Sequence, residues 1–140
     1  MISYLKIFVA TFIFITSCTN NVKKTSDNFK GIPKVDFCDL AKYSGQQVYI
    51  KCIYKGNQEY WSLSPIEKEC SENMNVALEF NNPNFDVPTK YEKIFNMGVP
   101  LIIEAIGKYE TGNNNGYGHL GLHTSHFIIS ELLVAKAYSL

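Results

Sequence analysis

The side chains of this sequence that could bind a metal ion are three histidines and one cysteine. His119, His123 and His126 lie close together in the chain, and Cys70 is a possible fourth ligand. Imidazole and thiolate groups suit zinc and copper. The histidines nevertheless fall on a glycine-rich loop and the start of a strand, with no His-Glu-x-x-His or Cys-x-x-Cys pattern to fix a geometry. We therefore expect no metal and no cofactor, and keep a zinc or copper site on these residues as the alternative.

Nucleophilic catalysis would need partners that the spacing does not supply. A pair of Cys70 and His119 would require an orienting carboxylate or amide, and there is no Gly-x-Ser-x-Gly elbow. Glu59 and Glu104 lie in or beside expected strands, where a solvated strand face explains both carboxylates. The sequence favours a protein that is not an enzyme, with a small hydrolase as the alternative.

Aromatic side chains are the better candidates for a binding surface. We expect this surface on one face of a β-barrel and on the loop before its last strand, formed by Tyr60, Trp61, Tyr109, Tyr117 and His119. The 13 basic residues are all lysines and are balanced by 13 acidic ones. Because nucleic acids bind to clustered positive charge, this balance excludes them and favours a glycan, a peptide or a partner protein.

The elements that would position these residues follow from the hydrophobic pattern. A period of two predicts strands over 47–55, 59–64 and 75–80, and longer apolar runs predict strands over 99–109 and 127–138. Asp36 can cap a short helix that ends near Gly45, and residues 88–98 have the spacing of an amphipathic helix. The order of three strands, a helix and two strands, joined by a loop over 110–125, is that of the five-stranded OB-fold barrel. Another small β-barrel or an α+β roll is the alternative.

The first residues of the chain predict its location. Lys6 precedes an apolar run from Ile7 to Ile15, as in a secretory signal, and this run is too short to span a bilayer. The tetrapeptide that ends at Cys18, Ile-Thr-Ser-Cys, resembles the lipobox of bacterial lipoproteins, in which the cysteine is acylated. We expect a signal peptide over 1–17, a flexible tether over 18–34 and one domain over 35–140. Acylation would anchor the protein to a membrane, and the absence of aspartate after Cys18 favours the outer membrane.

The remaining cysteines, Cys38, Cys52 and Cys70, are odd in number. Cys52 alternates with apolar residues of a strand and is expected to be buried. A hairpin that turns near residue 57 would carry Cys70 back toward the helix that holds Cys38, which predicts a Cys38–Cys70 disulfide. Three reduced thiols remain the alternative.

Three segments together resemble a family of uncharacterised bacterial envelope lipoproteins. They are Tyr43–Val48 (Tyr-Ser-Gly-Gln-Gln-Val), Leu63–Cys70 and, most distinctively, Gly116–Gly121 (Gly-Tyr-Gly-His-Leu-Gly). The resemblance covers most of the domain. It implies an OB-fold-like barrel in the cell envelope and carries no activity with it.

Overall fold

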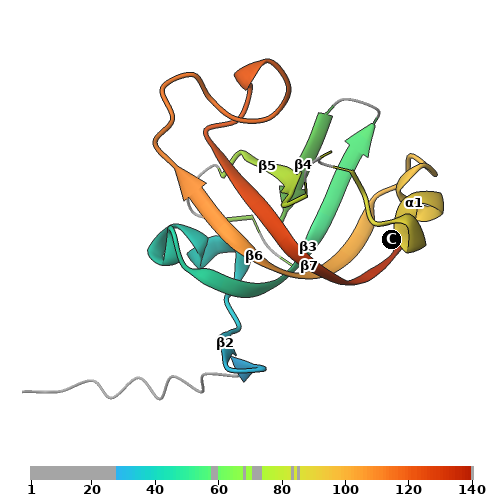
Figure 1. The fold of residues 1–140 in the computed structure, drawn as a ribbon, viewed down its shortest axis with the longest axis horizontal. Helices are drawn as coiled ribbons and strands as arrows, with labels where there is room; N and C mark the ends of the chain where they lie inside the picture. Colours follow the sequence, from blue (N-terminus) through green and yellow to red (C-terminus); the bar gives the residue numbers. More distant parts are fainter. Residues whose placement is uncertain are drawn as a thin grey trace, which may run out of the picture.

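The computed structural model describes residues 28–57, 60–67, 69–70, 74–82, 84 and 86–139 (Figure 1). Cys18 and the segments on either side of it, up to residue 27, lie outside the described residues. The fold is mainly β, and its elements are β1 (Asn28–Phe29), β2 (Ile32–Pro33), η1 (Phe37–Tyr43), β3 (Gln47–Asn57), β4 (Tyr60–Ser64), β5 (Val76–Phe80), α1 (Thr89–Phe95), β6 (Leu101–Thr111), η2 (His119–Gly121) and β7 (Ser125–Ala137).

The five long strands close into a barrel in the order β3-β4-β5-β7-β6. β3 pairs antiparallel with both β4 and β6, which closes the barrel between its first and fourth strands. β5 pairs with β7 in parallel, and β6 pairs with β7 antiparallel. This arrangement confirms the predicted OB-fold-like barrel.

The inward side chains of the strands form a single core. On β3 the alternation predicted from the sequence holds, because Val48, Ile50, Cys52 and Tyr54 are each at most 2% exposed. Inward residues of the other strands join them, among them Leu63, Val76, Leu78, Phe80, Leu101, Ile103, Phe127 and Ile129. Burial raises the pKa of the Cys52 thiol and raises the pKa of Tyr54 to about 12, since neither charged form can be solvated there.

Two register shifts bend the long β6–β7 ladder. They fall between Glu104 and Ala105 and between Ile106 and Gly107. A Cβ atom on Gly107 would lie 2.3 Å from the Ile128 carbonyl oxygen and 2.5 Å from the Phe127 ring. Only glycine therefore allows the two strands to approach this closely, and the resulting coil lets β6 and β7 curve around the core.

The two short helices close the ends of the barrel. η1 is a 3-10 helix rather than an α-helix; its Asp36 cap accepts a hydrogen bond from the Cys38 amide at 2.9 Å. α1 is shorter than predicted and places Phe95 in the core against Tyr54, with ring centroids 4.6 Å apart. Among the described residues, no helix has the length and apolar character needed to cross a bilayer.

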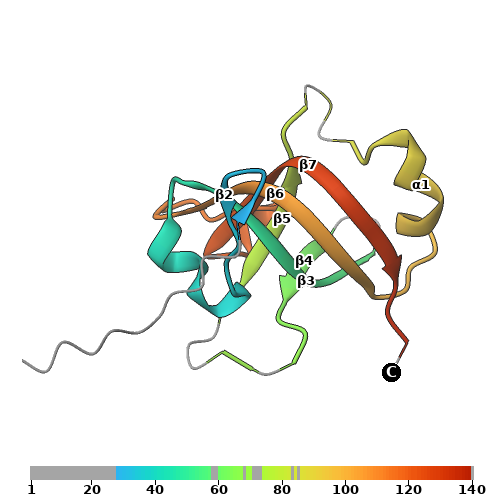
Figure 2. The same ribbon diagram turned by 90° about the horizontal axis from the view of Figure 1, so that it is seen from below.

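Residues 28–34, which the sequence analysis assigned to the tether, form a β1–β2 hairpin that packs on the barrel (Figure 2). Phe29 stacks on Tyr49 with ring centroids 5.2 Å apart, and Lys34 bridges to the Tyr49 backbone. Lys30 lies 3.5 Å from Glu131 of β7. The contacts with Tyr49 and Glu131 involve only a few residues, which explains why composition alone did not reveal them. They extend the folded part of the chain to residue 28.

Candidate functional site

The β6–β7 loop (residues 112–124) contains the Gly-Tyr-Gly-His-Leu-Gly motif. Gly116, Gly118 and Gly121 all have positive φ angles. A Cβ atom on Gly116 would lie 2.0 Å from the Gly121 carbonyl oxygen, and one on Gly121 would lie 2.2 Å from the Asn115 carbonyl oxygen. The loop therefore folds back on itself at distances that only glycine permits.

Asn113 organises the first half of this loop. Its side-chain amide donates to the Gly116 carbonyl at 2.9 Å, and its side-chain oxygen accepts from the Asn115 amide at 3.0 Å. Its backbone amide donates to the Tyr117 hydroxyl, and its carbonyl accepts from the Gly116 amide. One residue, through its side chain and its backbone, thus ties the loop to itself without the help of a strand.

His123 fastens the second half of the loop to the barrel. The backbone amides of His123 and Tyr117 each donate a hydrogen bond to the other residue's carbonyl. The His123 Nδ1 lies 2.6 Å from the side-chain oxygen of Asn75. The Asn75 amide group donates to the Leu122 carbonyl, which fixes its orientation, so the His123 Nδ1 carries the proton and donates. The ring is 8% exposed, and burial lowers the pKa of His123.

His126 lies under the base of the loop between two carboxylates. Its Nδ1 is 3.1 Å from Glu79 of β5, without the alignment of a hydrogen bond, and its Nε2 is 3.3 Å from Glu110 of β6. The Tyr117 ring covers the imidazole at a centroid distance of 4.0 Å. Lys108 lies 3.0 Å from Glu110, and together with His126 it lowers the pKa of that carboxyl. This cluster joins three strands and the loop.

Large apolar side chains project from the tip of the loop into solvent. Leu120 is 75% exposed and Leu122 is 57% exposed. Leu120 also adopts a left-handed conformation, with φ of 58°, that non-glycine residues rarely occupy. Tyr60, at the start of β4, meets the His119 ring edge to face with centroids 5.1 Å apart. We call Tyr60, His119, Leu120 and Leu122 the loop-tip surface.

The structure divides the aromatic residues that the sequence placed on one ligand surface. Tyr60, Tyr117 and His119 belong to the β6–β7 loop or touch it. Trp61 and Tyr109 instead face the core, and their assignment to the surface is corrected here. Trp61 lies opposite Gly56 in the β3–β4 register and meets the buried Tyr54 ring edge to face, with centroids 6.5 Å apart. Tyr109 continues the inward row of Leu101, Ile103 and Ala105 along β6 and pairs with the inward Phe127.

The three histidines do not surround a common point. His123 is turned toward Asn75, His126 lies between Glu79 and Glu110, and His119 meets Tyr60. The two nitrogens of His126 face different carboxylates, so a single ion could not replace both contacts. Within the part of the chain that the structure describes, no group of three or more histidine, cysteine, aspartate or glutamate side chains is arranged to hold a metal ion.

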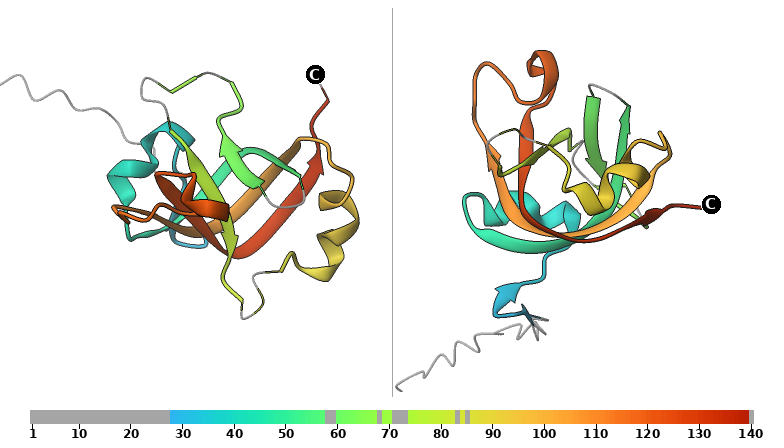
Figure 3. Two further views of the ribbon diagram at one scale, coloured as in Figure 1. Left: turned by 90° about the horizontal axis from the view of Figure 1, so that it is seen from above. Right: turned by 45° about the vertical axis from the view of Figure 1, so that its right-hand side comes forward.

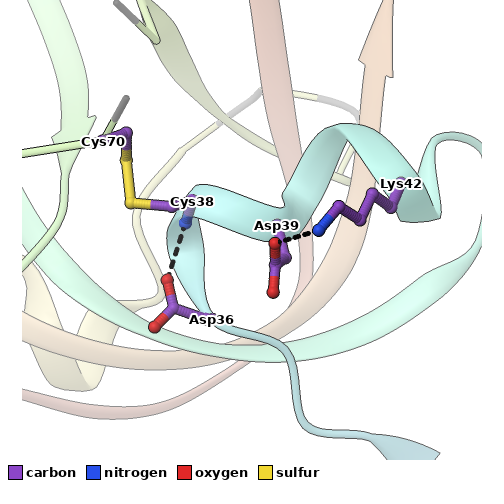
Figure 4. Close-up of a disulfide and its surroundings, with 5 residues drawn as sticks. All are labelled: Asp36, Cys38, Asp39, Lys42 and Cys70. Carbon is purple, nitrogen blue, oxygen red and sulfur yellow. Dashed lines mark hydrogen bonds and ion pairs between the residues drawn. A yellow bond between two sulfur atoms is a disulfide. The ribbon is translucent and has the colours of Figure 1, made fainter. Parts of the chain in front are cut away.

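Cys38 and Cys70 form a disulfide, the pairing that the position of the hairpin predicted (Figure 4). It ties η1 to the connection between β4 and β5, and Cys38 also receives the Asp36 cap. Cys70 therefore has no thiol with which to act as a nucleophile beside His119. Cys52 is free and buried inside the barrel.

Comparison of the chain with protein-family models, with curated proteins and with solved structures gave no match. The fold and the site together define a small OB-fold-like barrel with an ordered, apolar loop tip. Sequence reasoning did not select Asn75, Leu120 or Leu122. The close spacing of glycines 116, 118 and 121 was the available signal, since it implied a loop with an enforced shape.

Proposed function

We propose that this protein is a lipid-anchored component of a bacterial cell envelope, placed at the outer membrane, and that its barrel is a binding module without catalytic activity. Its ligand is a partner protein with an apolar docking patch. The loop-tip surface is the part of the barrel that meets this partner.

The single observation that carries the proposal is the exposure of Leu120 and Leu122 on a loop of enforced shape. Full burial of a leucine side chain stabilises a protein by about 1.5–3 kcal/mol relative to leaving it exposed. The isolated protein does not gain this full stabilisation at either position. The left-handed backbone at Leu120 costs roughly 1–2 kcal/mol more. Strain and exposed apolar side chains on an ordered loop are typical of a surface used for recognition.

The chemistry of this surface favours a protein over a glycan. Few aromatic rings on this surface are placed to stack on a sugar, because Tyr109 is buried in the core and Trp61 is half-buried against it. The most exposed side chains of this surface are those of Leu120 and Leu122, which offer no hydrogen bonds to sugar hydroxyl groups. A protein partner with an apolar pocket can bury them and gain their transfer free energy.

The position of the loop also suits an anchored module. The β1–β2 hairpin lies below the barrel in Figure 1, whereas the β6–β7 loop lies on its upper side, and the right-hand view of Figure 3 shows the same separation. An acyl chain on Cys18 would therefore anchor the protein with the hairpin side of the barrel facing the membrane. The loop-tip surface would then be free to meet a second envelope protein.

Site-specific photocrosslinking in the native cell tests the proposal. A photoreactive amino acid at position 122 should give one discrete protein adduct. The matched control is position 97, because Met97 is also apolar and 57% exposed but lies just after α1. The adduct should be absent from position 97, and Leu120→Asp should abolish it at position 122. The same products from both positions, or adducts with lipid alone, would overturn the proposal.

A further inference from the structure

We propose a second binding site on the outside of the barrel, in a groove that takes a neutral saccharide of one or two rings. The groove has a volume of about 400 Å³, within the range of small-molecule sites. It lies on the outer face of the sheet across β3, β6 and β7 and reaches the end of β5. The lining residues used below are Gln47, Asn81, Gly107, Lys108, Ile128 and Ser130.

The strand register brings the walls of the groove together. Gln47 lies opposite Lys108 in the β3–β6 pair, and Lys108 lies opposite Ile128 in the β6–β7 pair. These three side chains therefore form a row across three strands on the outer face. The Cβ position of Gly107 points toward the Phe127 ring in the core, so on the groove side this residue contributes only its backbone, next to Ile128.

The polar groups of the groove are held in position by the barrel. Gln47 Nε2 donates to Ser130 Oγ at 3.2 Å, and Ser130 Oγ donates to the Ile106 carbonyl at 3.1 Å. The Asn81 backbone amide donates to the Ile129 carbonyl at 2.8 Å, which fixes this residue at the rim. The side-chain oxygen of Gln47 and the side-chain amide of Asn81 are then available to a ligand as acceptor and donor groups.

The charge of the groove selects against ionic ligands. Lys108 Nζ lies 3.0 Å from Glu110, so its positive charge is already compensated. The remaining polar groups are two amides and a hydroxyl, which both donate and accept. Sugar hydroxyl groups are matched to such groups, whereas a carboxylate or phosphate would need an unpaired cation. Ile128 and the Gly107 backbone offer an apolar floor to the C–H face of a sugar ring.

Ligand-observed NMR on the full-length protein in detergent tests the site. The probes are N,N′-diacetylchitobiose, cellobiose and maltose, with digalacturonate as the charged comparison. At least one neutral disaccharide should bind at concentrations of about 10 mM or below. Asn81→Ala should weaken that binding roughly fivefold, the effect of one lost hydrogen bond, and Ile128→Trp should abolish it by filling the groove. Asn84→Ala, an exposed asparagine close by that is not part of the lining, is the matched control.

The outcomes separate this site from the loop-tip surface. Leu120→Asp should leave saccharide binding unchanged, because its side chain is not part of the groove. Tighter binding of digalacturonate would contradict a neutral ligand. Binding that survives both Asn81→Ala and Ile128→Trp, or no binding of any neutral probe, would overturn the site.

Discussion

At the scale of single residues, the shape of the β6–β7 loop depends on glycines whose roles differ. Gly116 has a positive φ angle and no room for a Cβ atom, because the Gly121 carbonyl oxygen occupies that space. Gly112, in the same loop, also has a positive φ angle but nothing within 4 Å of its Cβ position. A substitution at Gly112 therefore tests backbone strain alone, whereas one at Gly116 tests backbone strain together with a steric clash.

We expect Gly116→Ala to lower the free energy of unfolding clearly more than Gly112→Ala. Both substitutions place alanine in the left-handed region, at a cost of about 1–2 kcal/mol. Only Gly116→Ala adds a clash with backbone that cannot move without breaking the turn around Asn113. Urea unfolding of the two variants measures the difference. Equal losses would mean that the loop relaxes freely and that its shape is not enforced.

His123 makes the stability of the protein depend on pH. Burial lowers its pKa below the ordinary value of 6.5, so the unfolded chain binds more protons at mildly acidic pH. The contribution of His123 to stability is complete above 6.5 and is lost as the pH falls through the lowered pKa. We expect the His123 ring to titrate below pH 6.5 by NMR, and unfolding to require less urea at about pH 5.5 than at about pH 7.5.

A His123→Gln variant provides the control, because glutamine keeps a donor for Asn75 but does not titrate. Its urea midpoint should change less between the two pH values than that of the wild-type protein. A His123 ring that titrates at or above 6.5 would contradict the burial seen in the structure.

At the scale of elements, alternation predicted the first three long strands of the barrel, and continuous apolar runs predicted the last two. On β3 every second residue from Val48 to Tyr54 belongs to the core, although Tyr49 and Ile53 on the other face are also largely covered. On β6 the same count places Tyr109 inward with Leu101 and Ile103, so its burial could have been predicted; the register shifts instead add residues to β7 and interrupt the count there. Bulges depend on contacts between strands, which a local pattern does not contain.

The loop shows the same limit on prediction. Its glycines indicated an ordered turn, but the partner that fastens it, Asn75, lies 48 residues earlier in the chain. Trp61 was predicted to be exposed because nothing local shows that its neighbour across the β3–β4 pair is Gly56. Apart from Tyr109, the residues that were misplaced or missed are those whose surroundings come from distant segments.

The Cys38–Cys70 disulfide connects η1 to the segment between β4 and β5, and its loss should have a large effect. The bridge closes a segment with a sequence separation of 32. Chain-entropy arguments give a stabilisation of about 3–4 kcal/mol for such a loop. We expect the melting temperature to fall when reductant is added, and to fall similarly in Cys38→Ala.

The double variant Cys38→Ala/Cys70→Ala serves as the control, because it should no longer respond to reductant. Cys52 stays in the core throughout and should not react with an alkylating reagent before the protein unfolds. A melting temperature that is unchanged by reductant in the wild-type protein would show that the bridge does not stabilise the fold.

At the scale of the whole molecule, three surfaces have separate positions. The β1–β2 hairpin packs against Tyr49 and Glu131 below the barrel in Figure 1, the β6–β7 loop lies on the upper side, and the groove of Gln47 and Lys108 lies on the outer face of the sheet. This separation allows attachment, docking and saccharide binding to occur at once. It also means that a variant at one surface should leave the other two unchanged.

The proposed lipid anchor is tested by the intact mass of the protein purified from its own membranes, in wild-type form and as Cys18→Ala. The wild-type chain should lack residues 1–17 and carry the added mass of a diacylglycerol and an acyl chain, while Cys18→Ala should lack both changes. Alkylation after unfolding without reductant should modify one thiol, that of Cys52, because Cys38 and Cys70 are bridged. Stable attachment follows from several acyl chains, since a single chain binds a bilayer only weakly. An unacylated chain would exclude the anchor and leave the docking and saccharide sites to be judged by their own tests.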